Sequence, residues 1–311
     1  MQLTSNRIVV PALAAAVVVL AGVAFSQHRH AVAAAAALAT ANQQAAEQVA
    51  AAKAAAAAES ASAKAKPDKG AAPGAPCKLT DRELFDQMTI RYTDGRETWP
   101  KNKWLGIPAL QNPLDVWITQ EILTEVKPDF VVETGTFAGG SAALWATILE
   151  QLNDNARVIT IDVQDLSEPF RKTPILQKRV DFLIGSSVAP EIVADVKKRV
   201  DGKSAVVILD ALHTKEHVLN ELNAYAPIVP VGSYMIVQDG VFNGHPVPGG
   251  WGPGPYEAIE AFLAQSDEFV ADRSRERLLV TSNPMGFLRR VKPAPGAPAQ
   301  AAQANQAEGA K

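Results

Sequence analysis

The stretch DFVVETGTFAGGS, residues 129–141, decides how this chain folds. It opens with a short apolar run, continues through a glycine-rich segment and leads into a helical pattern over residues 142–152. This order is typical of a strand, a tight loop and a helix. Gly135 can adopt backbone conformations that strain other residues. Gly139 and Gly140 allow close approach to a ligand at a helix N-terminus, where free N–H groups point outward, so we expect a small polar ligand there.

The chain on either side of this loop alternates between strand and helix patterns. Continuous apolar strands that alternate with helices indicate a parallel sheet covered on both faces, an α/β fold. Further strands are predicted at residues 157–161, 180–184, 205–209 and 233–237, with a weak one at 269–271 and a last one at 285–291. Helices are predicted at residues 79–90, 113–126, 188–200, 214–225 and 255–264.

Two helices precede the loop, and tryptophans lie between and within them. Thr80 is the expected N-cap of the first helix, and Pro113 opens the second. We expect Trp99, Trp104 and Trp117 to cover one edge of the core, with a wall of a substrate pocket as the alternative.

Four of the predicted strands end in an acidic residue. Ligands of open α/β sheets bind beyond the carboxyl ends of the strands, where we expect Glu133, Asp162, Asp210 and Asp239. Asp162 follows the glycine loop by about twenty residues, a spacing that suits an acceptor for two ribose hydroxyls. A capping role explains any single one of these acids, but explains four together poorly.

Asp210 and Asp239 are candidate ligands for Mg²⁺, because this ion prefers carboxylate oxygens and keeps waters that a substrate hydroxyl can replace. The alternative is that both aspartates bond to loop amides. His213 lies just past a strand end and is a candidate general base. His217 lies one helical turn further on without the HExxH pattern of zinc sites, so we expect it to be a solvated or capping residue.

Composition narrows the class of protein. The chain has 311 residues and a formal net charge of −3, and its sequence shows no concentrated basic stretch, so a nucleic-acid partner is not expected. Cys77 is the only cysteine, which excludes an internal disulfide.

Residues 1–30 contain an uncharged run, residues 8–25, that is just long enough to cross a bilayer. We expect an uncleaved single-pass anchor in the plasma membrane with the globular part in the cytoplasm. The alternative is a signal peptide cleaved after a small-residue site, which would place the protein in the periplasm or outside the cell. Positive charge is nearly equal on both flanks and does not decide the orientation.

The remaining terminal segments are poor in large apolar residues. Residues 31–78 are mostly alanine and then proline and glycine, which predicts a spacer with a flexible joint. Residues 293–311 have a similar bias and are predicted to be disordered. Residues 79–292 are therefore the expected globular domain.

Several motifs carry a resemblance to a known family. The loop lacks GxGxxG, but an acid closing the strand before GxxxG resembles the first motif of S-adenosylmethionine (SAM) methyltransferases. Together the motifs resemble the cephalosporin hydroxylase and rhamnosyl O-methyltransferase family across residues 79–292. The motifs are Trp104-Leu-Gly-Ile-Pro, Pro113-Leu-Asp-Val-Trp117, Glu133-Thr-Gly-Thr, Gly139-Gly-Ser141, Gly185-Ser-Ser, Leu209-Asp210 with His213, Gly244-His-Pro, Gly252-Pro-Gly254 and Asp272-Arg-Ser-Arg-Glu-Arg277.

The resemblance implies a Rossmann-like SAM-dependent methyltransferase fold with an antiparallel last strand. It also implies a set of site residues. The implied SAM contacts are Glu133, Gly135, Gly139, Ser141, Asp162 and Ser186; the implied metal ligands are Asp210, Gln238 and Asp239; and His213 and His245 are the candidate proton acceptors. The family pattern has Glu where this chain has Gln238, which removes one charge from the metal site.

Three functions follow as hypotheses. The first is a membrane-tethered, SAM-dependent O-methyltransferase that acts on a hydroxyl of a sugar, glycolipid or secondary metabolite in lipid or cell-envelope biosynthesis. The second is an oxidoreductase component of the cephalosporin hydroxylase type, disfavoured because no 2-His-1-carboxylate set for iron is visible. The third is a binding module without turnover. A homo-oligomer is compatible with each of them.

Overall fold

The computed structural model describes residues 79–95, 97–250 and 252–293. The expected anchor, the spacer and nearly all of the expected C-terminal tail lie outside these residues. Within the described part of the chain, no helix is both long and apolar enough to span a membrane.

The described residues form helices and strands in close agreement with the sequence pattern. The helices are α2 (Asp81–Asp94), α3 (Pro113–Val126), α4 (Gly140–Leu152), α5 (Pro174–Arg179), α6 (Pro190–Val200), α7 (Lys215–Tyr225) and α8 (Pro255–Gln265). The strands are β1 (Lys103–Trp104), β2 (Ile107–Pro108), β3 (Phe130–Thr134), β4 (Arg157–Asp162), β5 (Val180–Ile184), β6 (Ala205–Leu209), β7 (Tyr234–Val237), β8 (Phe269–Ala271) and β9 (Phe287–Arg290). Short 3-10 helices cover Trp99–Lys101, Glu168–Phe170, Ala226–Ile228 and Arg273–Glu276.

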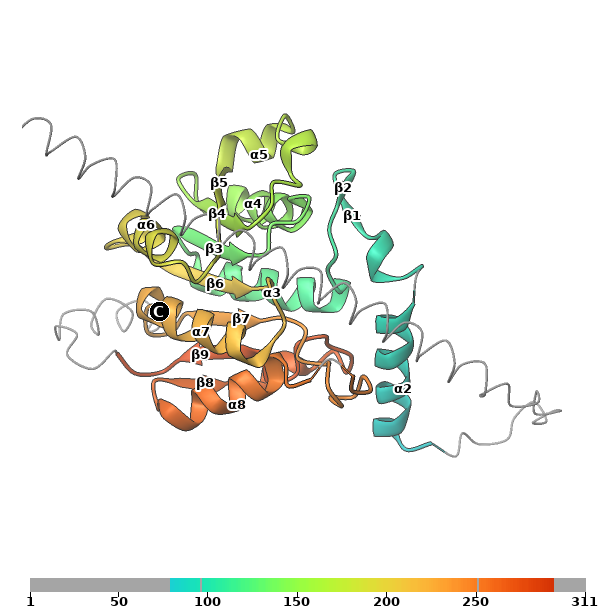
Figure 1. Ribbon diagram of the computed structural model, residues 1–311. Helices are drawn as coiled ribbons and strands as arrows, with labels where there is room; N and C mark the ends of the chain where they lie inside the picture. Colours follow the sequence, from blue (N-terminus) through green and yellow to red (C-terminus); the bar gives the residue numbers. More distant parts are fainter. Residues whose placement is uncertain (1–78, 96, 251, 294–311) are drawn as a thin grey trace, which may run out of the picture. The chain divides into compact units, whose positions relative to one another are not determined.

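Seven strands form one sheet in the order β5-β4-β3-β6-β7-β9-β8 (Figure 1). The first five of these are parallel, and β9 pairs antiparallel with both β7 and β8. The α/β fold, the mostly parallel sheet and the antiparallel last strand are therefore confirmed. The chain leaves β3 toward β5 on one side and returns to β6 on the other, so the strand order reverses between β3 and β6. Ligands of such sheets bind at this reversal.

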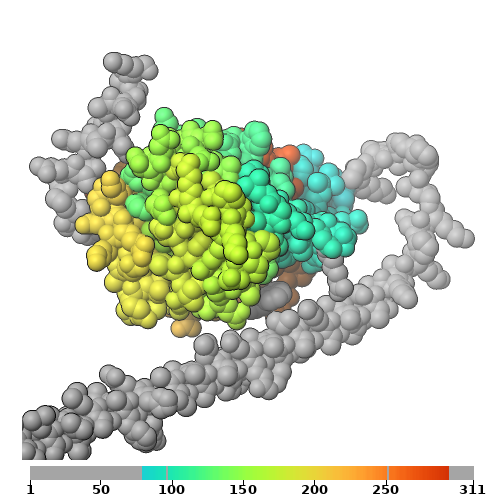
Figure 2. Space-filling view, turned by 90° about the horizontal axis from the view of Figure 1, so that it is seen from above, coloured from blue at the N-terminus to red at the C-terminus, as the bar shows by residue number. Residues whose placement is uncertain are grey.

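Each face of the sheet has its own apolar core, because successive strand residues point to opposite faces. Val131 on β3 packs with α3, α4 and α5, whereas its neighbour Val132 packs with α6, α7 and α8. Val206 and Val207 on β6 divide in the same way. The molecule is thus three layers thick, with helices on both faces as expected. Seen from above, the green-to-yellow segment that contains α5, β5 and α6 covers most of one side (Figure 2).

Differences from the sequence prediction concern short or polar elements. α4 begins two residues earlier than expected, and α5 was missed because six residues are too few to show a helical period. Thr80 caps α2 through a capping box, as predicted. The expected three-tryptophan cover is wrong for Trp117, whose side chain is 59 % exposed, whereas Trp104 packs against the core.

The backbones of the parallel neighbours β3 and β6 approach closely just beyond their carboxyl ends. Gly135 directly follows β3 with φ +88°, and its N–H donates to the carbonyl oxygen of Ile161 at 2.8 Å. A Cβ at this position would lie 1.9 Å from the carbonyl oxygen of Asp210. Glycine is therefore required twice, for its dihedral angle and for the space.

We predict that Gly135→Ala lowers the free energy of unfolding by about 3 kcal/mol or more, because overpacking adds to backbone strain. Gly202→Ala is the matched control, since Gly202 has φ +68° but nothing within 4 Å of a Cβ. It isolates the dihedral cost, about 1 to 2 kcal/mol. Urea denaturation of both variants measures the difference; equal losses would contradict the steric argument.

Candidate active site at the carboxyl ends of the strands

The loop between β3 and α4 lies at the strand reversal, and hydrogen bonds and a left-handed glycine fix its conformation. Gly139 caps α4 with φ +84°, and the Phe137 N–H donates to Asp162 Oδ2 at 2.9 Å. Gly140 was expected to allow close approach of a ligand. Instead it allows close approach of the chain itself, because a Cβ there would lie 2.1 Å from the carbonyl oxygen of Pro108. That glycine allows the β1–β2 hairpin to pack on α4, so its predicted close approach is to the chain itself.

Glu133 lies completely buried behind this loop. Its carboxylate accepts hydrogen bonds from Trp145 Nε1 at 2.9 Å and Thr160 Oγ1 at 2.7 Å, and from the Ser141 side chain. Burial raises the pKa of Glu133 to about 7, although these donors act against the shift. Glu133 and Ser141 thus brace the start of α4 from inside; direct contact of either residue with a cofactor stays a prediction.

Asp162 ends β4 on the exposed side of the loop. Its Oδ2 accepts from the Phe137 N–H, and its Oδ1 accepts from the Gln164 N–H at 3.1 Å. These two bonds fix the carboxylate while each oxygen retains a second acceptor site, and the side chain is only partly buried. This chemistry fits a ribose diol, and so the residues present fit SAM.

The turn after β5 lies next to Asp162 along the same edge. The Gly185 N–H donates to the Asp162 carbonyl oxygen at 2.8 Å, which places Ser186 beside the predicted ribose acceptor. The structure therefore brings Gly135, Gly139, Asp162 and Ser186 to one edge of the sheet, as the sequence predicted.

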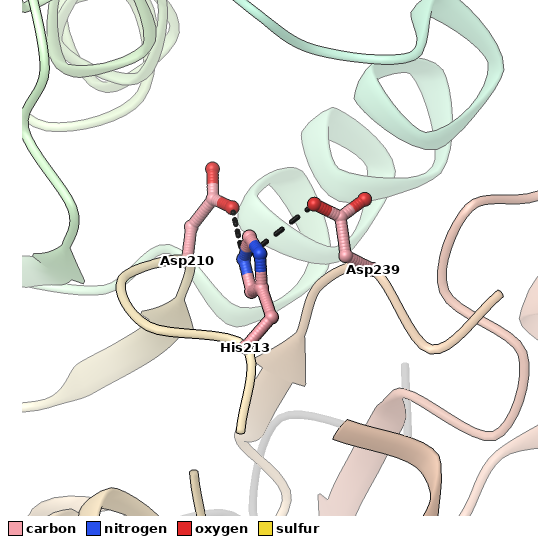
Figure 3. Close-up of side chains that lie close together, drawn as sticks. All are labelled: Asp210, His213 and Asp239. Carbon is pink, nitrogen blue, oxygen red and sulfur yellow. Dashed lines mark hydrogen bonds and ion pairs between the residues drawn. The ribbon is translucent and has the colours of Figure 1, made fainter. Parts of the chain in front are cut away.

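Asp210, His213 and Asp239 converge on the other side of the strand reversal (Figure 3). His213 Nε2 lies 3.3 Å from Asp210 Oδ1 and 3.5 Å from Asp239 Oδ2. Asp210 directly follows β6, and its N–H donates to the carbonyl oxygen of Thr134 on β3. Asp239 has φ +58°, a conformation that few residues other than glycine adopt.

The charges in this cluster depend on one another. Burial lowers the pKa of His213, but the carboxylates of Asp239 and Asp210 raise it by more. Burial raises the pKa of Asp239, His213 lowers it and Asp210 raises it, with a net upward shift. The imidazolium form of His213 therefore compensates one of the two carboxylate charges and reduces their mutual repulsion.

Sequence reasoning missed the residues that orient the two aspartates. Gln111, just before α3, is 5 % exposed and donates from Nε2 to Asp210 Oδ2 at 2.9 Å. Asn283 accepts the Asp239 N–H through Oδ1 at 3.1 Å, and Asp115 on α3 holds the adjoining Ser282 N–H at 2.7 Å. Burial raises the pKa of Asp115 to about 7. Uncharged amides far away in sequence carry no motif; only Asp115 lies inside a family-like stretch.

The donor set fits a divalent cation. The ligand atoms of Asp210, His213 and Asp239 all lie within 4.8 Å of one another. Mg²⁺ prefers the two carboxylates, whereas an imidazole suits transition metals better. Gln238 is only 6 % exposed, and its backbone N–H donates to the carbonyl oxygen of Leu209. Its role as a third ligand stays a prediction.

His245 belongs to a second cluster in the loop after β7. Its ring stacks on Tyr256 with centroids 3.7 Å apart, and its Nε2 lies 3.1 Å from Glu257 Oε1. Burial raises the pKa of Glu257, but the Gly254 N–H and Asn243 lower it to about 2. His245 is thus oriented by an anionic partner, as a proton acceptor needs to be. The expectation for the His217 side chain is wrong: it lies in a mostly buried polar cluster on α7.

Comparison with known proteins identifies the family of this chain. Residues 96–291 match the family model described as rhamnosyl O-methyltransferase/CmcI. Rhamnosyl O-methyltransferases of Mycobacterium tuberculosis (strain H37Rv) and Mycobacterium bovis (strain BCG) are each 38 % identical over 203 residues, covering 63 % of this chain and 81 % of theirs. The rhamnosyl O-methyltransferase of Mycobacterium leprae is 35 % identical over 189 residues, covering 59 % and 80 %.

Solved structures with a similar fold include CmcI with Mg and SAM, at a TM-score of 0.48 and 21 % identity over 65 % of this chain and 84 % of that one. An O-methyltransferase from Bacillus cereus with SAH has a TM-score of 0.39 and 15 % identity over 63 % and 84 %. The family match covers more than half of the chain. The chain therefore belongs to the rhamnosyl O-methyltransferase/CmcI family, and it is a SAM-dependent O-methyltransferase.

Proposed function

We propose that this protein transfers the methyl group of SAM to a hydroxyl of a sugar-containing acceptor, such as a glycolipid, in lipid or cell-envelope biosynthesis. The mycobacterial relatives are rhamnosyl O-methyltransferases, which supports a deoxysugar hydroxyl as the acceptor. A secondary metabolite with a similar hydroxyl is the alternative acceptor.

One observation carries this proposal. The acid and imidazole cluster of Asp210, His213 and Asp239 lies directly across the strand reversal from the glycine loop, and the Asp210 N–H bonds to the end of β3. A hydroxyl bound at the cluster would therefore meet a cofactor bound at the loop. Proximity of this kind converts a two-molecule reaction into an effectively one-molecule step.

The chain's own residues have three tasks in this reaction. Asp162 and the glycine loop bind SAM, which supplies a methyl group on a positively charged sulfur. The acid cluster orients the acceptor hydroxyl, and His213 is the first candidate for taking its proton, in the neutral imidazole form; the carboxylates of Asp239 and Asp210 oppose that form because they raise the pKa of His213. His245, held by Glu257, is the second candidate for that proton.

A divalent cation is a proposed addition to the site. Asp210 and Asp239 would hold it, with Gln238 as a neutral third ligand. Its charge would favour the ionised form of the acceptor hydroxyl.

The other two functions have less support. The cluster contains one histidine and two carboxylates rather than the two histidines and one carboxylate of non-haem iron oxygenases, which disfavours an oxidoreductase. A binding module without turnover is disfavoured by the family assignment, although Gln238 replaces a charged family residue. Methyl-transfer assays with labelled SAM separate these three functions.

We also propose that residues 8–25 anchor the protein in the plasma membrane, with residues 79–292 in the cytoplasm where SAM is made. The uncharged length of that run supports this placement. A small-molecule acceptor could reach the site from solution, and a glycolipid acceptor from the membrane surface.

The cofactor assignment predicts that Asp162→Ala weakens SAM binding more than about tenfold, because charge-assisted hydrogen bonds to a ribose diol are lost. Calorimetry measures the dissociation constant. Asp181→Ala is the control, since Asp181 near the start of β5 pairs with Arg157 at the start of β4, at the opposite end of the strands from Asp162. Unchanged SAM affinity in folded Asp162→Ala protein would contradict the assignment of Asp162 as the ribose acceptor.

The metal proposal predicts that Asp239→Asn abolishes Mg²⁺-stimulated turnover while SAM still binds. Gln238→Glu adds an anionic ligand and should tighten Mg²⁺ binding. Turnover is measured as a function of Mg²⁺ concentration. Binding of Mn²⁺ in place of Mg²⁺ is measured by electron paramagnetic resonance. If neither substitution changes the metal dependence, the aspartates act only through hydrogen bonds and positioning.

The anchor proposal predicts that the intact protein sediments with membranes and keeps its N-terminus. Deletion of residues 1–30 should release it to the soluble fraction with unchanged SAM affinity. N-terminal sequencing that finds a soluble form beginning near Gln27 would show a cleaved signal peptide instead.

A further inference from the structure

A buried polar cluster that the proposed reaction does not use joins α7 to the turn after β5. His217, Glu221 and Tyr225 are spaced four residues apart and so lie on one side of α7. We name them the α7 polar stripe. All three contact Ser187. This residue follows Ser186, which belongs with Gly135, Gly139 and Asp162 to the edge of the sheet proposed to bind SAM, named here the cofactor edge.

The contacts of Ser187 are numerous for one serine. Its Oγ donates to Glu221 Oε1 at 2.6 Å and lies 3.1 Å from His217 Nε2. Its carbonyl oxygen accepts from Tyr225 Oη at 2.6 Å. Because the single hydroxyl proton goes to Glu221, the Ser187–His217 contact requires a proton on Nε2 of the histidine. The stripe therefore holds Ser187 by both its side chain and its backbone.

Glu221 is costly as a purely structural residue. It is 0 % exposed, and its Oε2 has no hydrogen-bond partner among the described residues. Burying a carboxylate oxygen without a donor is unfavourable, and an apolar side chain on α7 would fill the same core space. Local rules of this kind are typically broken where function requires it.

The turn that the stripe holds is tied to the cofactor edge from the other side as well. The Gly185 N–H bonds to the carbonyl oxygen of Asp162, and the Ala189 N–H bonds to that of Ser186. Ser186 is therefore fixed between the ribose acceptor on β4 and the stripe on α7.

We infer that the α7 polar stripe is a positioning device that sets the Gly185–Ser187 turn for SAM binding. The inference rests on the proposed placement of SAM at this edge. It assigns no chemical step to His217, Glu221 or Tyr225; they act on the cofactor through Ser187 and Ser186.

Tyr225→Phe is the sharpest test, because it removes one hydroxyl and leaves the ring in the core. Loss of one buried hydrogen bond predicts a rise in the SAM dissociation constant of about fivefold. Glu221→Gln, which keeps an acceptor for Ser187, should act in the same direction. The charge of Glu221 also contributes at His213, so its effect on turnover is not a clean measure.

Tyr234→Phe is the matched control. Tyr234 is also almost fully buried, and its hydroxyl bonds to Asp272, but it lies at the start of β7 away from the cofactor edge. We expect it to lower the melting temperature comparably while leaving SAM affinity unchanged. Hydrogen exchange should accelerate at residues 183–189 in Tyr225→Phe and stay unchanged there in Tyr234→Phe.

The outcomes separate the possible errors. Unchanged SAM affinity in Tyr225→Phe, with Asp162→Ala still impaired, overturns the inference and leaves the cofactor site intact. An equal loss of affinity in Tyr234→Phe also overturns it, because the effect is then one of general stability. If Asp162→Ala binds SAM normally as well, the placement of the cofactor is wrong and the inference fails with it.

Discussion

The close approach of Gly135 to the Asp210 carbonyl oxygen is the constraint on which the rest of the site depends. It allows the ends of β3 and β6 to lie side by side. The glycine loop and the acid cluster therefore begin at adjacent strand ends, and this junction of β3 and β6 is called the seam below. A side chain at this position would separate the strand ends between the glycine loop and the acid cluster.

Support for the two sides of the seam comes from opposite faces of the sheet. The acid cluster is oriented from the α3 side, through Gln111 and the loop that Asp115 holds. The cofactor edge is oriented from the α7 side, through Ser187. Buried polar side chains in both helical layers thus do the orienting, while the apolar residues of each layer hold the sheet. Such polar networks specify one arrangement because each unpaired member would be costly.

The sequence predicted the sheet well because its signals are local. Apolar runs such as residues 205–209 and a proline at the start of α3 need no knowledge of the remaining chain. The acids at the strand ends were also found, since strand ends of a parallel sheet meet at one edge. Gln111, Asn283 and the buried setting of His217 were not found, because their contacts join residues far apart in sequence. Trp117 misled for the opposite reason: its apolar character suggested burial, but one helical face of α3 is open.

The left-handed backbone at Asp239 has a consequence for how this site can evolve. Aspartate, asparagine and glycine tolerate φ +58°, whereas glutamate and branched residues do so poorly. Substitutions of Asp239 that preserve the backbone conformation are therefore mainly to asparagine or glycine, and both remove the negative charge. The neighbouring Gln238 carries no such dihedral constraint. Homologues that have lost catalysis while keeping the domain should be recognisable by asparagine or glycine at the position equivalent to Asp239.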